Sequence, residues 1–178
     1  MLLTEIPTLD AVLQAHASAL GRDLTAYRNH AYRVVNFCVA FSSGNAEPLE
    51  KAAIAAAFHD LGIWTAGTFD YLEPSMRLAT AHLVRAGRSA WVEEIEAMIL
   101  EHHKVRRCRA DPGWLVEPFR KADWVDVSRG FVRFGLPRAL VADAYATWPG
   151  AGFHTRLVQL SLRRLRTHPL SPLPMMRL

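Results

Sequence analysis

The sequence has little cysteine and no long apolar segment. Two cysteines, Cys38 and Cys108, cannot build a disulfide framework, so we expect a reducing, cytoplasmic location. The longest uninterrupted aliphatic or aromatic run, Ala52 to Phe58, is far shorter than the roughly 20 residues that a membrane-spanning helix needs. Because Glu5 and Asp10 interrupt the apolar start and no basic segment precedes it, we expect no signal peptide.

The composition is typical of one globular domain. The chain has 178 residues, of which 51% are hydrophobic and 21% charged. This length suffices for one sizeable core and is short for two, so we expect a single domain over residues 1–178. The first 90 residues carry seven Lys and Arg against eight Asp and Glu, whereas the remainder carries fourteen against nine. A basic second half suits an anionic ligand, although a solvated basic face explains it equally well.

Apolar residues recur with helical spacing along nearly the whole chain, and no period-two alternation predicts a strand. We expect Ser75 and Ser89 to cap helices and Gly62 and Gly87 to end them. The sequence therefore predicts an all-α domain of seven or eight helices, including segments at 25–42, 48–61, 75–86, from 89 onward, 113–128, 137–147 and 151–166.

Two segments fall outside this helical pattern. The expected loop from Gly62 to Pro74 carries three aromatic residues, which either shape a substrate entrance or pack over helix ends: Trp64, Phe69 and Tyr71. The tail 167–178 is rich in proline, which removes backbone donors and prevents a continuous α-helix. We expect this tail to be a disordered end or an extended arm on this or a neighbouring subunit.

Histidine is the unusual component, with eight copies in the chain. His30 continues the apolar face of its predicted helix, and His102 and Asp123 continue the apolar faces of theirs. The pair His59-Asp60 ends the most apolar helix. Ionisable groups on inward faces cost free energy unless they are paired or bound to metal. One such histidine is usually structural, but several from five predicted helices indicate a shared site.

The order of these residues resembles the HD-domain superfamily of metal-dependent phosphohydrolases. That family has the pattern H…HD…H…H…D on successive helices, and this chain offers His30, His59-Asp60, His82, His102-His103 and Asp123. The segment 57–62 (AFHDLG) looks like the family's central motif, and 121–123 (KAD) looks like its closing aspartate. The resemblance covers about residues 25–130 and implies a compact helical bundle with a metal centre in its core.

The resemblance also implies roles for individual residues. It implies a first metal site made of four residues: His30, His59, Asp60 and Asp123. Asp60 bridges two ions in binuclear members, and the second ion is expected at His82 and at the pair His102/His103, of which the apolar face favours His102. The middle histidines favour two ions rather than one. Imidazole and carboxylate suit Fe, Mn, Co, Ni or Zn, with Mg a further candidate.

We therefore expect a hydrolase that acts on a small anionic phosphoester or nucleotide, with His59 and Asp60 at the catalytic position. A bound divalent ion can lower the pKa of water from about 15.7 to about 7, which would supply the nucleophile. Three cations near the motifs are candidates for binding the phosphate, and each could equally be a surface residue: Arg33, Lys104 and Arg107. The segment after the paired histidines lacks the Gly-Tyr-Pro of the cyclic-di-GMP-degrading branch, which disfavours that activity.

Two alternatives stay open. A minority of HD proteins with this ligand pattern look like mixed-valence diiron oxygenases, and ligand types do not separate the two chemistries. A non-catalytic HD module that binds a nucleotide or a protein would instead use the basic second half, including Arg156, Arg163, Arg164 and Arg166. Those arginines lack interleaved aromatic residues, so the sequence does not favour nucleic acid as a partner, and a homo-oligomer stays open.

Overall fold

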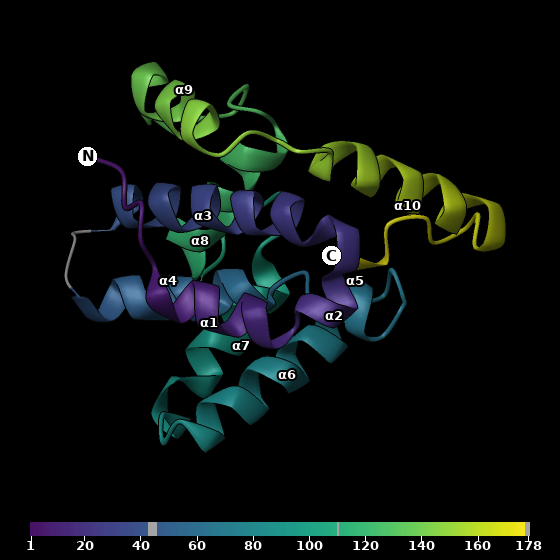
Figure 1. The fold of residues 1–178 in the computed structure, drawn as a ribbon, viewed down its shortest axis with the longest axis horizontal. Helices are drawn as coiled ribbons and strands as arrows, with labels where there is room; N and C mark the ends of the chain where they lie inside the picture. Colours follow the sequence, from purple (N-terminus) through teal and green to yellow (C-terminus); the bar gives the residue numbers. More distant parts are fainter. Residues whose placement is uncertain (43–45, 110, 177–178) are drawn as a thin grey trace.

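The chain folds into α-helices joined by turns and longer loops (Figure 1). A computed structural model describes residues 1–42, 46–109 and 111–176, and this part of the chain contains no strand. The predicted all-α class is confirmed. The longer helices are α1 (Pro7–Ala15), α3 (Leu24–Phe41), α4 (Ala46–Phe58), α6 (Leu72–Arg85), α7 (Val92–Glu101), α8 (Val116–Val127), α9 (Arg138–Thr147) and α10 (Phe153–Thr167). The shorter elements are α2 (Ala17–Leu20), α5 (Gly62–Thr65) and the 3-10 turns η1 (Gly21–Asp23), η2 (Ser89–Trp91) and η3 (Pro174–Met176).

Helix α4 lies at the centre of the fold, with α1, α3, α6 and α7 packed around it. Its sequence from Ala52 to Phe58 is apolar on every side and fully buried. The alanines let the surrounding helices approach closely, and a helix that is apolar all round belongs in a core. The end of α4, which leads directly into His59 and Asp60, is therefore held in the middle of the protein.

Helix α3 is the second central element, packed between α4 and α8. It is buried continuously from Asn29 to Cys38, and this stretch includes the polar residues His30, Arg33 and Asn36. Buried polar groups need partners. Asn29 donates to the carbonyl of Pro149, and Asn36 accepts from the backbone N–H of Leu3, so α3 is tied to two other parts of the chain. Asn36 also donates to the carbonyl of Tyr32 within α3.

Several boundaries differ from the sequence-based expectations. The segment from Pro7 to Leu20 forms α1 and α2, which the apolar pattern did not single out. Helix α6 begins at Leu72, so Ser75 lies inside the helix rather than at its cap. Ser89 begins a 3-10 turn, and α7 follows it.

Gly62 begins the short helix α5 instead of merely ending α4, and close packing explains the glycine. A Cβ atom at this position would lie 2.5 Å from the carbonyl oxygen of Tyr71 and 3.0 Å from Pro74 Cβ. The N–H of Gly62 donates to Ser75 Oγ at 2.9 Å. These contacts dock the turn that carries Asp60 directly onto the start of α6.

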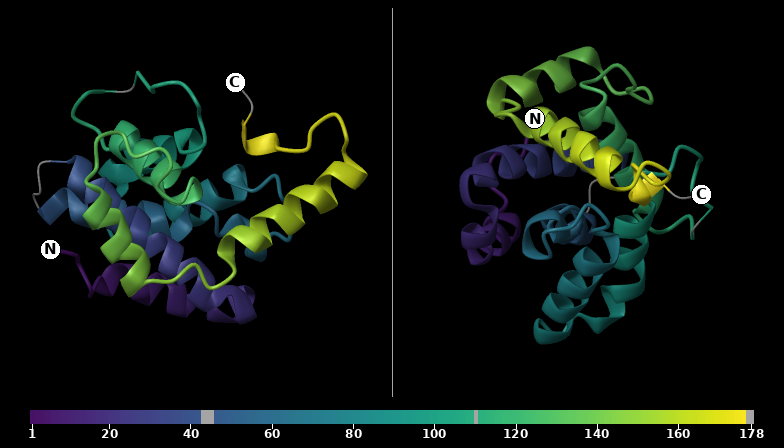
Figure 2. Two further views of the ribbon diagram at one scale, coloured as in Figure 1. Left: turned by 90° about the horizontal axis from the view of Figure 1, so that it is seen from above. Right: turned by 90° about the vertical axis from the view of Figure 1, so that its right-hand side faces the viewer.

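The C-terminal part projects and then turns back. Helix α10 extends away from the central helices, and the chain after it returns toward the body (Figure 2). Met175, in η3, packs with Ile63, Phe69 and Tyr71 in a small hydrophobic cluster separate from the main core. The described end of the tail thus lies on its own chain. No helix in the described ranges is both long enough and apolar enough to span a membrane.

Candidate metal centre

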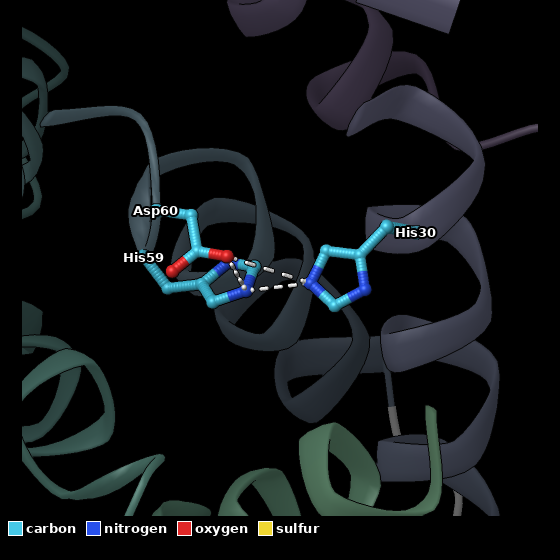
Figure 3. Close-up of side chains that lie close together, drawn as sticks. All are labelled: His30, His59 and Asp60. Carbon is cyan, nitrogen blue, oxygen red and sulfur yellow. Dashed lines mark hydrogen bonds and ion pairs between the residues drawn. The ribbon is translucent and has the colours of Figure 1, made fainter. Parts of the chain in front are cut away.

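Four parts of the fold bring six of the predicted ligands together. The group consists of His30 on α3, His59 and Asp60 in the turn after α4, His102 and His103 after α7, and Asp123 on α8. We call this group the His–Asp cluster. Figure 3 shows three of its members, with His30 facing His59 and Asp60 from the opposite helix. All members are buried except His103, whose side chain is 16% exposed.

Three of the histidines are oriented by a hydrogen bond at Nδ1. His59 Nδ1 lies 2.9 Å from the carbonyl oxygen of Ala56, and His102 Nδ1 lies 2.6 Å from that of Ile99. His30 Nδ1 lies 2.6 Å from Asp126 Oδ2. Since carbonyl and carboxylate oxygens only accept, each ring carries its proton on Nδ1. In its neutral form each ring then presents the lone pair of Nε2 to the cluster, which is the arrangement typical of metal-binding histidines.

These lone pairs converge without donors to satisfy them. His30 Nε2 and His59 Nε2 lie 2.9 Å apart, and with both protons on Nδ1 neither ring can donate to the other. His102 Nε2 and one oxygen each of Asp60 and Asp123 are buried without a hydrogen-bond partner in the described structure. Unsatisfied buried acceptors are costly. A cation would satisfy all of these atoms at once, so the residues fit a metal ion.

Asp60 is shared between two groups of possible metal ligands. The first group is His30, His59 and Asp60, and the second is Asp60, His102 and His103. Asp60 Oδ2 lies 3.5 Å from His59 Nε2 and 3.8 Å from His30 Nε2, while its Oδ1 lies 3.5 Å from His102 Nε2. Ligand atoms bound at about 2.1 Å from one ion are separated from each other by roughly 3.0 to 3.4 Å. The nitrogen and oxygen atoms of each group would therefore have to move only slightly closer together to bind an ion.

Asp123 completes the cluster from α8. Its Oδ1 lies 3.6 Å from His30 Nε2 and 3.8 Å from His59 Nε2, and its Oδ2 lies 3.5 Å from His103 Nδ1. The carboxylate therefore faces the first group with one oxygen and His103 with the other. The structure thus brings Asp123, the last residue of the sequence motif, beside His30, His59 and His103.

Burial shapes the protonation of the cluster. Burial lowers the pKa of His59 to about 3, which keeps the ring neutral and its lone pair available. Burial raises the pKa of Asp123 to about 7, against the opposing effect of the His102 ring. Burial acts in the same direction on Asp60, but His59 and His102 outweigh it and hold the pKa of that carboxyl well below its usual range. Asp60 is thus held ionised, while a second negative charge on Asp123 is costly in this buried site unless a positive charge lies beside it.

A buried ion pair between Arg33 and Asp126 lies next to His30, on the Nδ1 side of its ring. Arg33 donates through Nε and Nη2 to the two oxygens of Asp126, the same carboxylate that accepts from His30 Nδ1. Arg33 Nη1 also donates to the carbonyl of Trp148 at 2.6 Å. Burial opposes the charge on Asp126, but His30 and Arg33 outweigh it and hold the pKa of its carboxyl well below the usual range. The pair fixes the orientation of His30.

Two tyrosines hold other members of the cluster. The hydroxyl of Tyr27 accepts from the N–H of Asp60 at 3.2 Å and donates to the carbonyl of Ala57 at 3.1 Å, which fixes the turn after α4. The hydroxyl of Tyr71 lies 2.6 Å from His103 Nε2. Both tyrosines are buried, so these hydrogen bonds are shielded from water.

His82 does not join the cluster, and its assignment as a metal ligand is corrected. Its ring packs against Phe58, the last residue of α4, with ring centroids 5.3 Å apart. His82 instead borders a pocket that also contains His16, Arg85 and Arg88. The apolar spacing of α6 placed His82 on a helix face but did not determine which neighbour that face meets.

The three proposed phosphate-binding cations have different positions. Arg33 is fully buried and its guanidinium is occupied by Asp126 and Trp148, which corrects its assignment to substrate. Lys104 is half-buried and lies 3.5 Å from Glu101, and Arg107 is exposed. In the described structure neither Lys104 nor Arg107 contacts the His–Asp cluster. Both follow His103, the most exposed member of that cluster.

The aromatic residues after the central motif pack within the protein. Phe69 and Tyr71 belong to the small hydrophobic cluster with Met175, and Trp64 Nε1 donates to Asp23 Oδ2 at 2.9 Å. Asp126 and the hydroxyl of Tyr71 were not identified from the sequence. Asp126 could have been, since it lies three residues after Asp123 and therefore on the same side of α8.

Comparisons with protein-family models, with curated proteins and with solved structures found no match to this chain.

Proposed function

We propose that the protein is a metal-dependent phosphohydrolase of the HD type, with the His–Asp cluster holding one ion in each of two groups that share Asp60. The substrate class we propose is a small phosphoester or nucleotide. The observation that carries the proposal is the convergence of three Nε2 lone pairs on two buried carboxylates, with each ring fixed at Nδ1. Imidazole and carboxylate together suit divalent transition metals.

The cluster residues and their neighbours have different roles in this proposal. His30, His59, Asp60 and Asp123 would hold the first ion, and Asp60 with His102 and His103 the second. Asp126 positions His30, and the Tyr27 hydroxyl positions the backbone of Asp60. Divalent metal at such a site supplies activated water for attack on phosphorus and neutralises charge on the phosphoryl oxygens. Burial of the cluster excludes bulk water and strengthens these interactions.

The side of the cluster formed by His103 is the favoured approach for substrate. His103 is its only partly exposed member, and the exposed segment 105–107 follows it. That segment and Lys104 contribute three cations, namely Lys104, Arg106 and Arg107. Cations beside the approach favour an anionic substrate. A cytoplasmic location and a single domain remain part of the proposal.

Metal content and hydrolysis test the proposal together. Protein purified without chelating resin is expected to carry about two equivalents of transition metal by elemental analysis. Under anaerobic conditions with Mn²⁺ or Co²⁺, it should hydrolyse members of a phosphoester and nucleotide panel. His102→Gln removes a ligand, whereas His82→Gln removes a histidine outside the cluster and serves as the matched control.

Each outcome discriminates between hypotheses. Loss of metal and hydrolysis in His102→Gln, with both retained in His82→Gln, supports the proposal. Protein that binds no metal under any condition contradicts it and leaves a non-catalytic module. Bound iron with a mixed-valence signal, oxygen-dependent turnover and no anaerobic hydrolysis would instead establish the oxygenase alternative.

A further inference from the structure

A cavity outside the His–Asp cluster has features of a ligand site. It has a volume of about 800 Å³ and lies between the turn after α8, helix α9 and the start of α10. Its lining includes Arg129, Arg133 and Arg138. We call it the arginine cavity. None of the six cluster residues lines it, and its size suits a ligand of drug-like or mononucleotide size.

The charges around this cavity are unbalanced. In residues 1–42, 46–109 and 111–176, no carboxylate forms an ion pair with Arg129, Arg133 or Arg138, and no Asp or Glu lines the cavity. Elsewhere, Arg28 and Arg120 lie against carboxylates. The planar guanidinium of arginine can donate two parallel hydrogen bonds to phosphate oxygens. Several guanidinium groups without carboxylate partners around one cavity favour an anion with more than one charge.

The cavity also offers flat apolar surface. Val141 and Phe153 are buried in its lining, and Tyr145 lies beside them. Phe131, another lining residue, is 93% exposed. Aromatic and aliphatic groups next to cations suit a ligand that combines a planar ring with an anionic group.

Unusual backbone conformations frame the cavity. In the described part of the chain, the non-glycine residues with positive φ are Arg129, Phe134 and Ala151, at 52°, 45° and 45°. All three lie in the two turns that border the cavity, and Arg129 and Ala151 line it directly. Left-handed conformations are costly for residues with a Cβ and concentrate at binding sites.

The arginine cavity is adjacent to the His–Asp cluster but separate from it. The Phe153 ring, which lines the cavity, stacks on His30 with ring centroids 4.0 Å apart. Tyr145 and His154, also in the lining, both donate to the backbone carbonyl of Asp126. A ligand in the cavity would therefore lie behind His30 and would not reach the converging Nε2 atoms.

We propose that the arginine cavity binds a small phosphate ester that carries a planar ring, at a site distinct from the His–Asp cluster. The unpaired arginines bind the phosphate, and Phe131 and Phe153 contact the ring. The inference goes beyond the proposed hydrolytic function, because it depends on residues that hold no metal in that proposal.

Titration calorimetry with 5′-AMP, adenosine and inorganic phosphate tests this site, with chelator present to prevent turnover. We expect 5′-AMP to bind at least ten times more tightly than adenosine or phosphate alone. The double variant Arg133→Gln/Arg138→Gln should weaken 5′-AMP at least tenfold. Arg22→Gln is the matched control, because the Arg22 side chain is 85% exposed and lies away from the cavity.

Two further variants locate the bound molecule. Phe131→Ser should weaken 5′-AMP while leaving phosphate binding unchanged, and His102→Gln should leave 5′-AMP binding unchanged. The proposal is overturned if the arginine double variant binds 5′-AMP as well as the unchanged protein does, or if adenosine or phosphate matches 5′-AMP. Loss of 5′-AMP binding in His102→Gln alone would place the nucleotide at the His–Asp cluster instead. Failure of metal binding would leave this result unaffected, so the two proposals fail separately.

Discussion

His30 and Asp126 are joined by a hydrogen bond of 2.6 Å between the ring Nδ1 and the carboxylate Oδ2, although 96 positions separate them in the sequence. Arg33, one turn after His30 on α3, donates to the same carboxylate. Helices α3 and α8 are thus joined by the proposed ligand His30, the carboxylate of Asp126 and the buried guanidinium of Arg33.

Replacement of Asp126 should destabilise the fold and weaken metal binding. Asp126→Asn leaves Arg33 buried without its counter-charge, which typically costs about 3–5 kcal/mol in the free energy of unfolding. Loss of the support for His30 should lower metal affinity about 10- to 100-fold. Chemical denaturation and metal titration measure the two effects. Asp143→Asn, at an exposed position on α9, is the control, and equal stability of the two variants would contradict the role of Asp126.

Metal should stabilise the folded chain by mass action. At about 100 times its dissociation constant, a ligand that binds only the folded state adds about 2.7 kcal/mol, or roughly 5 to 10 °C in Tm for a chain of this size. Thermal unfolding with added Mn²⁺ or Zn²⁺ and then with chelator should show this gain and its reversal. His59→Gln removes a ligand of the first ion and leaves the second group intact, so it should reduce the gain, whereas His82→Gln should retain it in full. A gain of equal size in His59→Gln would mean that the metal binds elsewhere.

Substitution of Gly62 should disturb the turn that carries Asp60. In Gly62→Ala the new Cβ would meet the Tyr71 carbonyl at 2.5 Å, and backbone cannot yield as a flexible side chain does. Overpacking of this kind costs about 1–3 kcal/mol. Gly113→Ala, where the new Cβ meets only the Asp111 side chain at 3.2 Å, is the control. Denaturation midpoints that coincide for the two variants would show that the contact with Tyr71 is unimportant.

The hydroxyl of Tyr71 should matter more for metal binding at His103 than for folding. Tyr71→Phe removes the 2.6 Å contact with His103 Nε2 but keeps the buried ring. The loss of one hydrogen bond should lower the free energy of unfolding by about 0.5–1.5 kcal/mol. In titrations we expect weaker binding of the second equivalent of metal and an unchanged first. Equal weakening of both would indicate that Tyr71 acts on the whole cluster.

Stability should fall in mild acid partly because of His82. Burial and the nearby Arg85 lower the pKa of His82 from its usual 6.5, so the folded state binds protons less readily than the unfolded state. The stabilising difference is complete above pH 6.5 and is lost as the pH falls through that value toward the lower folded-state pKa. Unfolding measured between pH 8 and pH 5 should show a shallower decline in His82→Gln than in the unchanged protein. Parallel curves would contradict the shift.

The sequence predicted those features that depend on spacing along one helix. The inward positions of His30, His102 and Asp123 follow from apolar periodicity. Helices formed around His30 and Asp123, and α7 ends one residue before His102. Spacing could not determine which neighbour a face would meet, so His82 was assigned to the wrong place. The pairing of Arg33 with Asp126 joins positions 93 residues apart, and no local pattern reveals such a partner.

The N–H groups of Asp60 and Gly62 are both bonded to hydroxyls from other helices, namely to Tyr27 on α3 and to Ser75 on α6. Neither amide is protected by a helical ladder, so each exchanges with solvent deuterium only when its neighbouring helix undocks. The exchange rate of the Asp60 amide therefore reports on the packing of α3 against the turn after α4. The exchange rate of the Gly62 amide reports separately on the packing of α6 against the same turn. Local opening on either side of the turn that carries Asp60 can thus be observed in the intact protein, without any substitution.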